Sequence, residues 1–137
     1  LTIKEMVAQL QLSSTPVFER IKKLERSGVI KRYVALVEPA LIGKTINAFV
    51  QVSLKEHDET SVKKFEEAIV KLPEIMECHH VSGNHDFLLK VLVRDMEHCH
   101  QFLRQQLSNL PNISKTETLF SLAVRKSTTA VAVEENE

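Results

Sequence analysis

The chain has 137 residues, of which 43% are hydrophobic and 26% charged, and its 18 basic side chains balance 18 acidic ones. This composition is typical of a folded domain and excludes a mainly disordered chain. No apolar run approaches the roughly 20 residues of a membrane-spanning helix, and no signal-peptide pattern is evident, so we expect a cytoplasmic protein without membrane contact. Two cysteines, Cys78 and Cys99, are too few for a disulfide framework and fit a reducing compartment.

The charge is distributed unevenly along the chain. Residues 1–44 carry eight Lys and Arg against four Glu, a net charge of +4, whereas residues 45–137 carry ten basic against fourteen acidic side chains, a net charge of −4. A basic N-terminal part joined to an acidic body indicates two modules, the first with an anionic partner. We therefore predict one domain with its linker over residues 1–44 and a second domain over residues 45–137.

The N-terminal residues predict two short helices. Thr2-Ile3-Lys4-Glu5 has the spacing of a capping box, and apolar residues then recur on one face of a helix: Ile3, Met6, Val7 and Leu10. The second helix has Ser13, Ser14 or Thr15 as its N-cap, Pro16 in its first turn and Gly28 as its C-cap. Its buried stripe is Val17, Ile21 and Leu24. Two short helices, the second basic on its free face, indicate a helix-turn-helix.

The second helix also carries the groups that DNA recognition needs. Small hydroxyls at its start can approach phosphates, Arg20 can donate two bonds to guanine, and neighbouring cations suit phosphates. The β-prone segment Val29–Val37 is expected to form a wing. The predicted DNA-binding residues are Ser13, Ser14, Thr15, Pro16, Arg20, Lys22, Lys23, Arg26, Lys31 and Arg32. The alternative is an ordinary surface helix with solvated Lys and Arg.

The second module alternates strands and helices. Strands are predicted over Asn47–Lys55, twice within Ile75–Val93 and over Ile113–Val124, with helices over Ser61–Leu72 and Met96–Leu110. The tail Lys126–Val133 is expected to add a short edge strand. The order βαββαβ predicts a ferredoxin-like, four-stranded antiparallel sheet with both helices on one face. The other face then requires cover, which we expect from the sheet of a second copy.

The segment Ile75–Val93 is the centre of this module. Alternation predicts Met76, Cys78 and His80 on one face of the first strand and Ile75, Glu77, His79 and Val81 on the other. Ser82-Gly83-Asn84-His85-Asp86 is a tight connection in which Gly83 and Asn84 tolerate positive φ. The run Phe87–Val93 is nearly all apolar, as in a central strand covered on both faces.

The spacing of the Cys and His residues along the sequence argues against a metal site, and no pattern indicates catalysis. The side chains considered are Cys78, His79, His80, His85, His98, Cys99 and His100, and none has the repeated spacing of a zinc site. No nucleophile–base arrangement, phosphate loop or carboxylate pair stands out. We therefore expect neither an enzyme nor a bound cofactor or metal.

Several segments resemble one known family. Val81–Lys90, VSGNHDFLLK, is similar to the VSGxxD(Y/F)LLK segment of the leucine-responsive regulatory protein/AsnC (Lrp/AsnC) transcription factors. Leu12–Ile21 resembles the start of their recognition helix, and Leu24–Ile30 and Leu110–Ile113 match as well. The resemblance implies an α+β protein with a winged helix-turn-helix and a ferredoxin-like ligand-sensing domain, built as homodimers that assemble into octamers. Family members have one more helix before this point, so it also implies a DNA-binding domain that lacks its first helix.

The resemblance further implies an amino-acid effector, bound between dimers at the tip of the central hairpin. Carried over by position, the effector-binding residues are Ser82, Gly83, Asn84 and Asp86 at the rim, Thr116 and Thr118 on the last strand, and His80. Independently of the family, the amides of Gly83 and Asn84 suit a carboxylate, and Asp86 suits an ammonium group. The alternative for Asp86 is that it only caps its own turn.

We therefore expect a sequence-specific regulator that binds double-stranded DNA and whose activity or assembly changes when an amino acid binds. The alternative is a stand-alone amino-acid-sensing and oligomerisation module that does not bind DNA.

Overall fold

The computed structural model describes residues 2, 4–5, 8 and 14–134. The chain divides into two compact units, residues 1–37 and residues 38–137. None of the helices in the described part of the chain is long and apolar enough to cross a membrane.

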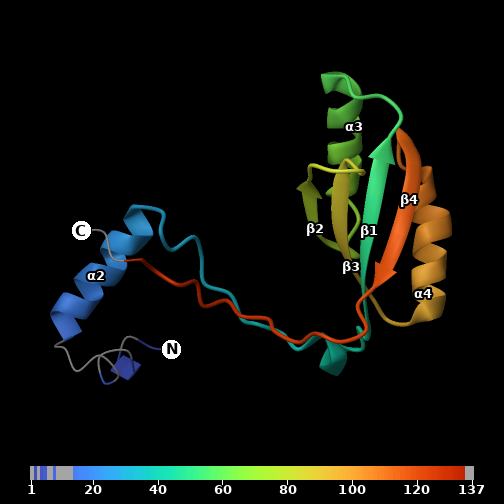
Figure 1. The fold of residues 1–137 in the computed structure, drawn as a ribbon. Helices are drawn as coiled ribbons and strands as arrows, with labels where there is room; N and C mark the ends of the chain where they lie inside the picture. The colour runs from blue at the N-terminus through green and yellow to red at the C-terminus, as the bar shows by residue number, and fades with distance from the viewer. Residues whose placement is uncertain (1, 3, 6–7, 9–13, 135–137) are drawn as a thin grey trace. The chain divides into compact units, whose positions relative to one another are not determined.

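In the first unit, one predicted cap of each helix is present. Glu5 N–H donates to Thr2 Oγ1 at 3.1 Å, and Thr2 N–H donates to Glu5 Oε2 at 3.1 Å, which confirms the capping box. The apolar face predicted for Ile3, Met6, Val7 and Leu10 lies outside the described residues. Helix α2 (Ser14–Arg26; Figure 1) buries Val17, which is 1% exposed. Gly28, with φ +82°, follows the helix end as predicted.

The predicted wing is not a strand. Val29–Val37 is largely extended and exposed, and Tyr33 Oη donates to Glu25 Oε1 of α2 at 3.0 Å. A strand exists only when another segment accepts and donates its backbone bonds, and no described segment of the chain pairs with this one. The prediction failed because β-propensity describes a residue's fit to a sheet but does not provide the neighbouring strand.

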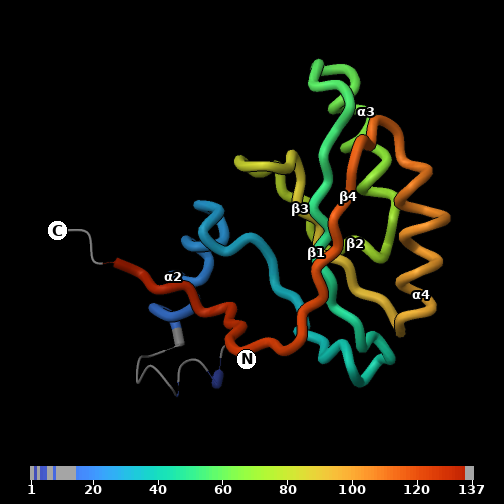
Figure 2. The backbone as a smooth tube through the Cα atoms, turned by 45° about the vertical axis from the view of Figure 1, so that its right-hand side comes forward, coloured from blue at the N-terminus to red at the C-terminus, as the bar shows by residue number. Residues whose placement is uncertain are grey.

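The second unit has the predicted βαββαβ order. Its elements are β1 (Ile46–Leu54), α3 (Glu59–Ile69), β2 (Ile75–His80), β3 (Phe87–Val93), α4 (Met96–Gln101) and β4 (Ile113–Phe120). The four strands form one antiparallel sheet in the order β2-β3-β1-β4. Figure 2 shows α3 and α4 on the same side of this sheet, so the ferredoxin-like prediction is confirmed.

The core lies between the sheet and these two helices. Alternate residues of the two central strands face the helices: Ala48, Val50, Val52 and Leu54 of β1, and Phe87, Leu89, Val91 and Val93 of β3. They pack with Phe65 and Ile69 of α3 and with Cys99, Phe102 and Leu107. The opposite face of β3, which includes Leu88 and Leu92, is only half-buried in the single chain.

The second predicted helix changes its winding along its length. α4 continues as a π-helical segment, η2 (Phe102–Gln106), and a 3₁₀ turn, η3 (Leu107–Asn109). Phe102 and Leu107 are each 1% exposed, although they are five positions apart. A wider turn between them allows both side chains to face the sheet.

Two further predictions are corrected. The register of β2 against β3 shifts between Ile75 and Glu77, so Ile75 pairs with Val91 on the helix-covered face rather than sharing the face of Glu77 and His79. A bulge adds one residue and reverses the alternation on one side of it. The tail Lys126–Val133 forms no strand, because no described segment pairs with it. The linker contains a short 3₁₀ turn, η1 (Pro39–Ile42), followed by Gly43.

Candidate DNA-binding and effector sites

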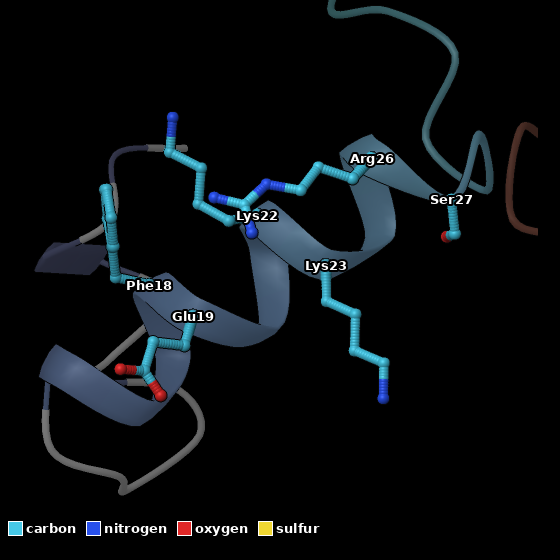
Figure 3. A pocket seen from close by; sticks show the side chains of 6 residues that line it. All are labelled: Phe18, Glu19, Lys22, Lys23, Arg26 and Ser27. Atoms are coloured by element: carbon cyan, nitrogen blue, oxygen red, sulfur yellow. The ribbon is translucent and has the colours of Figure 1, made fainter.

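The exposed side of α2 carries a pocket, the cationic hollow, that combines basic side chains with one aromatic ring. It is lined by Phe18, Glu19, Lys22, Lys23, Arg26 and Ser27 (Figure 3). Phe18, Lys22 and Arg26 follow one another along one side of the helix, and Lys22 Nζ lies 5.3 Å from the centroid of the Phe18 ring. This contact positions the ammonium group by a cation–π interaction. Phe18 is not among the predicted DNA-binding residues, although a large aromatic residue among cations on the polar face was a visible signal.

Arg20 lies on a different side of α2. At 3.6 residues per turn, it is about 160° from Lys22 and about 120° from Arg26 around the helix axis. It therefore flanks the stripe that contains the buried Val17. A double-helical surface in contact with Lys22 and Arg26 meets Arg20 only at its edge.

The other predicted DNA-binding residues are scattered. Thr15 and Pro16 are exposed in the first turn of α2, Ser14 begins the helix, and Ser13 lies outside the described residues. Lys23 is exposed and lines the cationic hollow. Lys31 and Arg32 are exposed on the extended segment after the helix.

The connection between β2 and β3 presents its backbone to solvent at the end of the sheet. Ser82, Gly83 and Asn84 are exposed, and Gly83 has φ +116°, a conformation that side chains with a Cβ rarely adopt. The connection is closed by one backbone bond, in which Val81 N–H donates to Asp86 O at 2.9 Å, and Asp86 N–H then donates to Val52 O of β1 at 2.8 Å.

The Asp86 carboxylate joins this connection to β1. Leu54 N–H donates to Asp86 Oδ2 at 2.7 Å, and His57 Nε2 lies 3.1 Å from the same oxygen. The Leu54 N–H, followed by His57, lowers the pKa of Asp86 below its ordinary value. The interpretation of Asp86 as a cap of its own turn is therefore wrong, because its side chain bonds across the sheet to a residue 32 positions away.

His85 forms a second link at the same end of the sheet. Its Nδ1 lies 3.0 Å from Ser53 Oγ of β1, and its Nε2 lies 3.2 Å from Glu117 Oε2 of β4. The His85 side chain is only 11% exposed. This chain of Ser, His and Glu crosses three elements that are distant in sequence, so spacing along the sequence gave no signal for it.

The remaining predicted effector residues lie apart in a single chain. His80 is on β2, with its ring stacked on Phe87 at a centroid distance of 4.6 Å. Thr116 and Thr118 are on β4, paired with Val52 and Val50. Since β2 and β4 are the two edge strands, the three strand spacings between them amount to roughly 14 Å. One chain therefore does not bring His80 together with the two threonines.

A smaller hollow lies beside His80, between β2 and α3. It is lined by Glu66, Ile69, Val70, Cys78, His80 and Phe87. Burial, followed by the nearby Glu66 carboxylate, raises the pKa of the Cys78 thiol. Both cysteines are free thiols. Within the described ranges, no three His, Cys, Asp or Glu side chains are grouped so that they could hold a metal ion.

Comparison with known proteins decides the family. The model of the Lrp/AsnC ligand-binding domain matches residues 47–131, and a winged helix-turn-helix DNA-binding model matches residues 1–31. The leucine-responsive regulatory proteins of Klebsiella pneumoniae and Escherichia coli K12 are each 39% identical over 114 residues, which are 83% of this chain and 70% of each relative. The chain belongs to the Lrp/AsnC family.

Solved structures agree with this membership of the Lrp/AsnC family. A transcriptional regulator from Neisseria meningitidis, solved as an L-Met complex, has a TM-score of 0.91 and 28% identity, covering 96% of this chain and 85% of its own. An AsnC-family regulator from Agrobacterium tumefaciens has a TM-score of 0.88 and 30% identity, covering 96% and 86%. This Lrp/AsnC protein is therefore an effector-modulated, DNA-binding transcription regulator and not an enzyme.

Proposed function

We propose that this regulator contacts double-stranded DNA mainly through Lys22 and Arg26 of α2 and binds an amino acid at the connection between β2 and β3. The arrangement around Asp86 carries the second half of the proposal. The Asp86 carboxylate is fixed by the hydrogen bond from Leu54 N–H and belongs to a connection whose residues Ser82–Asn84 are exposed. A carboxylate can bind the ammonium group of an amino acid, and backbone amides can bind its carboxylate.

On the DNA side, the proposal rests on the cationic hollow of α2. Lys22 and Arg26 share one side of the helix with Phe18, and Lys23 stands beside them. Lys and Arg neutralise phosphates, whereas Arg also reads guanine edges. Ser13, Ser14, Thr15 and Pro16 would approach the backbone at the start of the helix, with Arg20 at the edge and Lys31 and Arg32 on neighbouring phosphates.

On the effector side, Asp86 has room for a ligand. Both of its described bonds run to Oδ2, and its side chain is 26% exposed, so Oδ1 can accept an ammonium group. The effector carboxylate would then bond to the amides of Ser82, Gly83 and Asn84. The L-Met complex of the Neisseria meningitidis regulator, which is 28% identical, supports an amino acid as the ligand class.

The proposed pocket is completed by other copies of the chain. Thr116 and Thr118 lie on the opposite edge of the sheet from His80, so a pocket that contains all three side chains would combine residues of two subunits. The half-buried Phe49, Leu88 and Leu92 lie on the face without helices and would pack on a second sheet. A homodimer that assembles further, to an octamer, would bring both edges together. The free thiols fit a reducing cytoplasm.

Two binding experiments test the proposal. A duplex selected from a random library by the purified protein is titrated with wild type, Arg26→Ala and Arg20→Ala by fluorescence anisotropy; we expect the larger loss for Arg26→Ala. The twenty common L-amino acids are then screened by thermal shift, since a ligand of the folded protein raises its melting temperature. Equal losses in both variants would refute the DNA assignment. A flat screen would refute an amino-acid effector.

A further inference from the structure

A side chain that can carry a positive charge, His57, already lies beside the Asp86 carboxylate. Of its two partners, the Leu54 N–H belongs to the frame of the sheet, because it lies at the end of β1 and Leu54 is 5% exposed. His57 belongs to the polar connection that follows β1, and its side chain is 65% exposed. The imidazole is therefore the removable partner of Asp86. It lies 3.1 Å from Oδ2 of the same carboxylate whose other oxygen, Oδ1, we assign to the effector ammonium group.

We propose that His57 and the ammonium group of the effector compete for Asp86, so that protonation of His57 weakens effector binding. The inference rests on the effector site proposed above. It adds regulation of that site by pH, because the fraction of the protein that has effector bound would fall as the pH falls.

The direction of the expected change in effector affinity follows from the charges at the site. Imidazole is the side chain whose charge changes between about pH 5 and 8. A neutral His57 offers Asp86 one ordinary hydrogen bond, whereas a protonated His57 offers a full positive charge, which an arriving ammonium group must displace or tolerate at close range. Asp86 itself stays ionised through this range, because Leu54 N–H and His57 lower its pKa.

The surrounding charges do not provide the same competition. Asp58 accepts Ser61 N–H as the cap of α3, and His85 is held between Ser53 and Glu117 of the neighbouring strands. His80 of β2 makes no hydrogen bond to Asp86 and influences it only through its charge. The other charged side chains of the connection, Lys55 and Glu56, are exposed. A comparison of variants at position 57 therefore isolates the effect of this imidazole.

The test measures effector affinity at two pH values. The full chain is titrated calorimetrically at pH 8.0 and pH 5.5 with the tightest-binding of the twenty common L-amino acids. Complete exclusion by the charged imidazole raises Kd about tenfold over this interval, and partial competition raises it at least about twofold. His57→Gln keeps a polar side chain without a titrating charge, so its Kd should rise less between the two pH values than that of wild type and lie within about twofold of wild type at pH 8.0.

His79→Gln is the matched control. It removes another exposed imidazole that pairs with a carboxylate, Glu77 at 2.9 Å, from β2 rather than from the effector site. This variant should keep the pH response of wild type. An equal rise of Kd in wild type and His57→Gln, or no rise in either, would overturn the competition while leaving the effector site intact.

A second measurement tests the pair without an effector. The NMR signals of the His57 ring are compared at pH 5.5 in wild type and in Asp86→Asn, and loss of the carboxylate 3.1 Å away should change their chemical shifts. Identical chemical shifts would show that the pair does not form in solution and would overturn the inference. Absence of binding by all twenty amino acids at both pH values would refute the effector site, and the competition for it would fall as well.

Discussion

Replacing Asp86 by alanine tests the geometry of the hairpin end most directly. The substitution removes the acceptor of Leu54 N–H, a 2.7 Å bond at the 5%-exposed end of β1. A bond between a shielded amide and a charged acceptor contributes about 1.5–3 kcal/mol, and the exposed His57 contact adds little to it. We expect the free energy of unfolding to fall by about 2 kcal/mol, which lowers Tm by roughly 8 °C in a domain of this size. Thermal and urea unfolding followed by circular dichroism measure both quantities.

Asp86→Asn separates stability from binding. Its amide oxygen can still accept the Leu54 N–H, so it should recover a large part of the lost stability, but it offers no charge to an ammonium group. Effector binding should fall in both variants. Asp95→Ala serves as the control, since Asp95 caps α4 through a 2.8 Å bond from His98 N–H and takes no part in the hairpin connection. It should destabilise the protein by about 1 kcal/mol and leave effector affinity unchanged.

The pH dependence of Asp86 has a definite sign. Its pKa is lower in the folded protein than in the unfolded chain, so its contribution to stability is present above the unfolded pKa, about 3.9, and is lost as the pH falls through the folded pKa. The stability difference between wild type and Asp86→Asn should therefore persist from pH 5 to 8 and shrink below about pH 4. A Tm for Asp86→Ala within about 2 °C of wild type at pH 7 would refute the reasoning.

Four further substitutions probe the rest of the molecule. Arg26→Ala should weaken binding to a selected duplex about five- to tenfold and, if it contacts a phosphate, reduce the slope of log K against log salt by about 1; an unchanged slope with altered base preference would make it a base contact. His85→Ala should lower the free energy of unfolding by about 1–2 kcal/mol in urea, because it breaks the links to Ser53 and Glu117, and a wild-type midpoint would contradict the link. Leu89→Ala, at a fully buried position of β3, should cost about 2–5 kcal/mol, whereas Phe18→Ala, 44% exposed on α2, should change stability by less than about 0.5 kcal/mol in the same assay.

Local sequence determined the elements of the second unit and the caps of the first. The Thr2–Glu5 box, Gly28 after α2, and the alternation of β1 and β3 each depend on residues within a few positions of one another. Side-chain period and cap chemistry act over that same range, so the sequence expresses them directly. The order of strands and helices then allowed only a few topologies, and the antiparallel sheet with two helices on one face was among them.

Only the tertiary structure decided what meets at the end of the sheet. Leu54 and Asp86, like Ser53 and His85, are 32 positions apart, and their contacts depend on the register of β3 against β1. The bulge at Ile75–Glu77 reversed one face of β2, and the order β2-β3-β1-β4 placed His80 and Thr116 at opposite edges. Val29–Val37 has strand-forming residues but no strand, since a strand is completed by hydrogen bonds to another segment. Residue pattern specifies which segments can pair; only the folded arrangement specifies which segment each one meets.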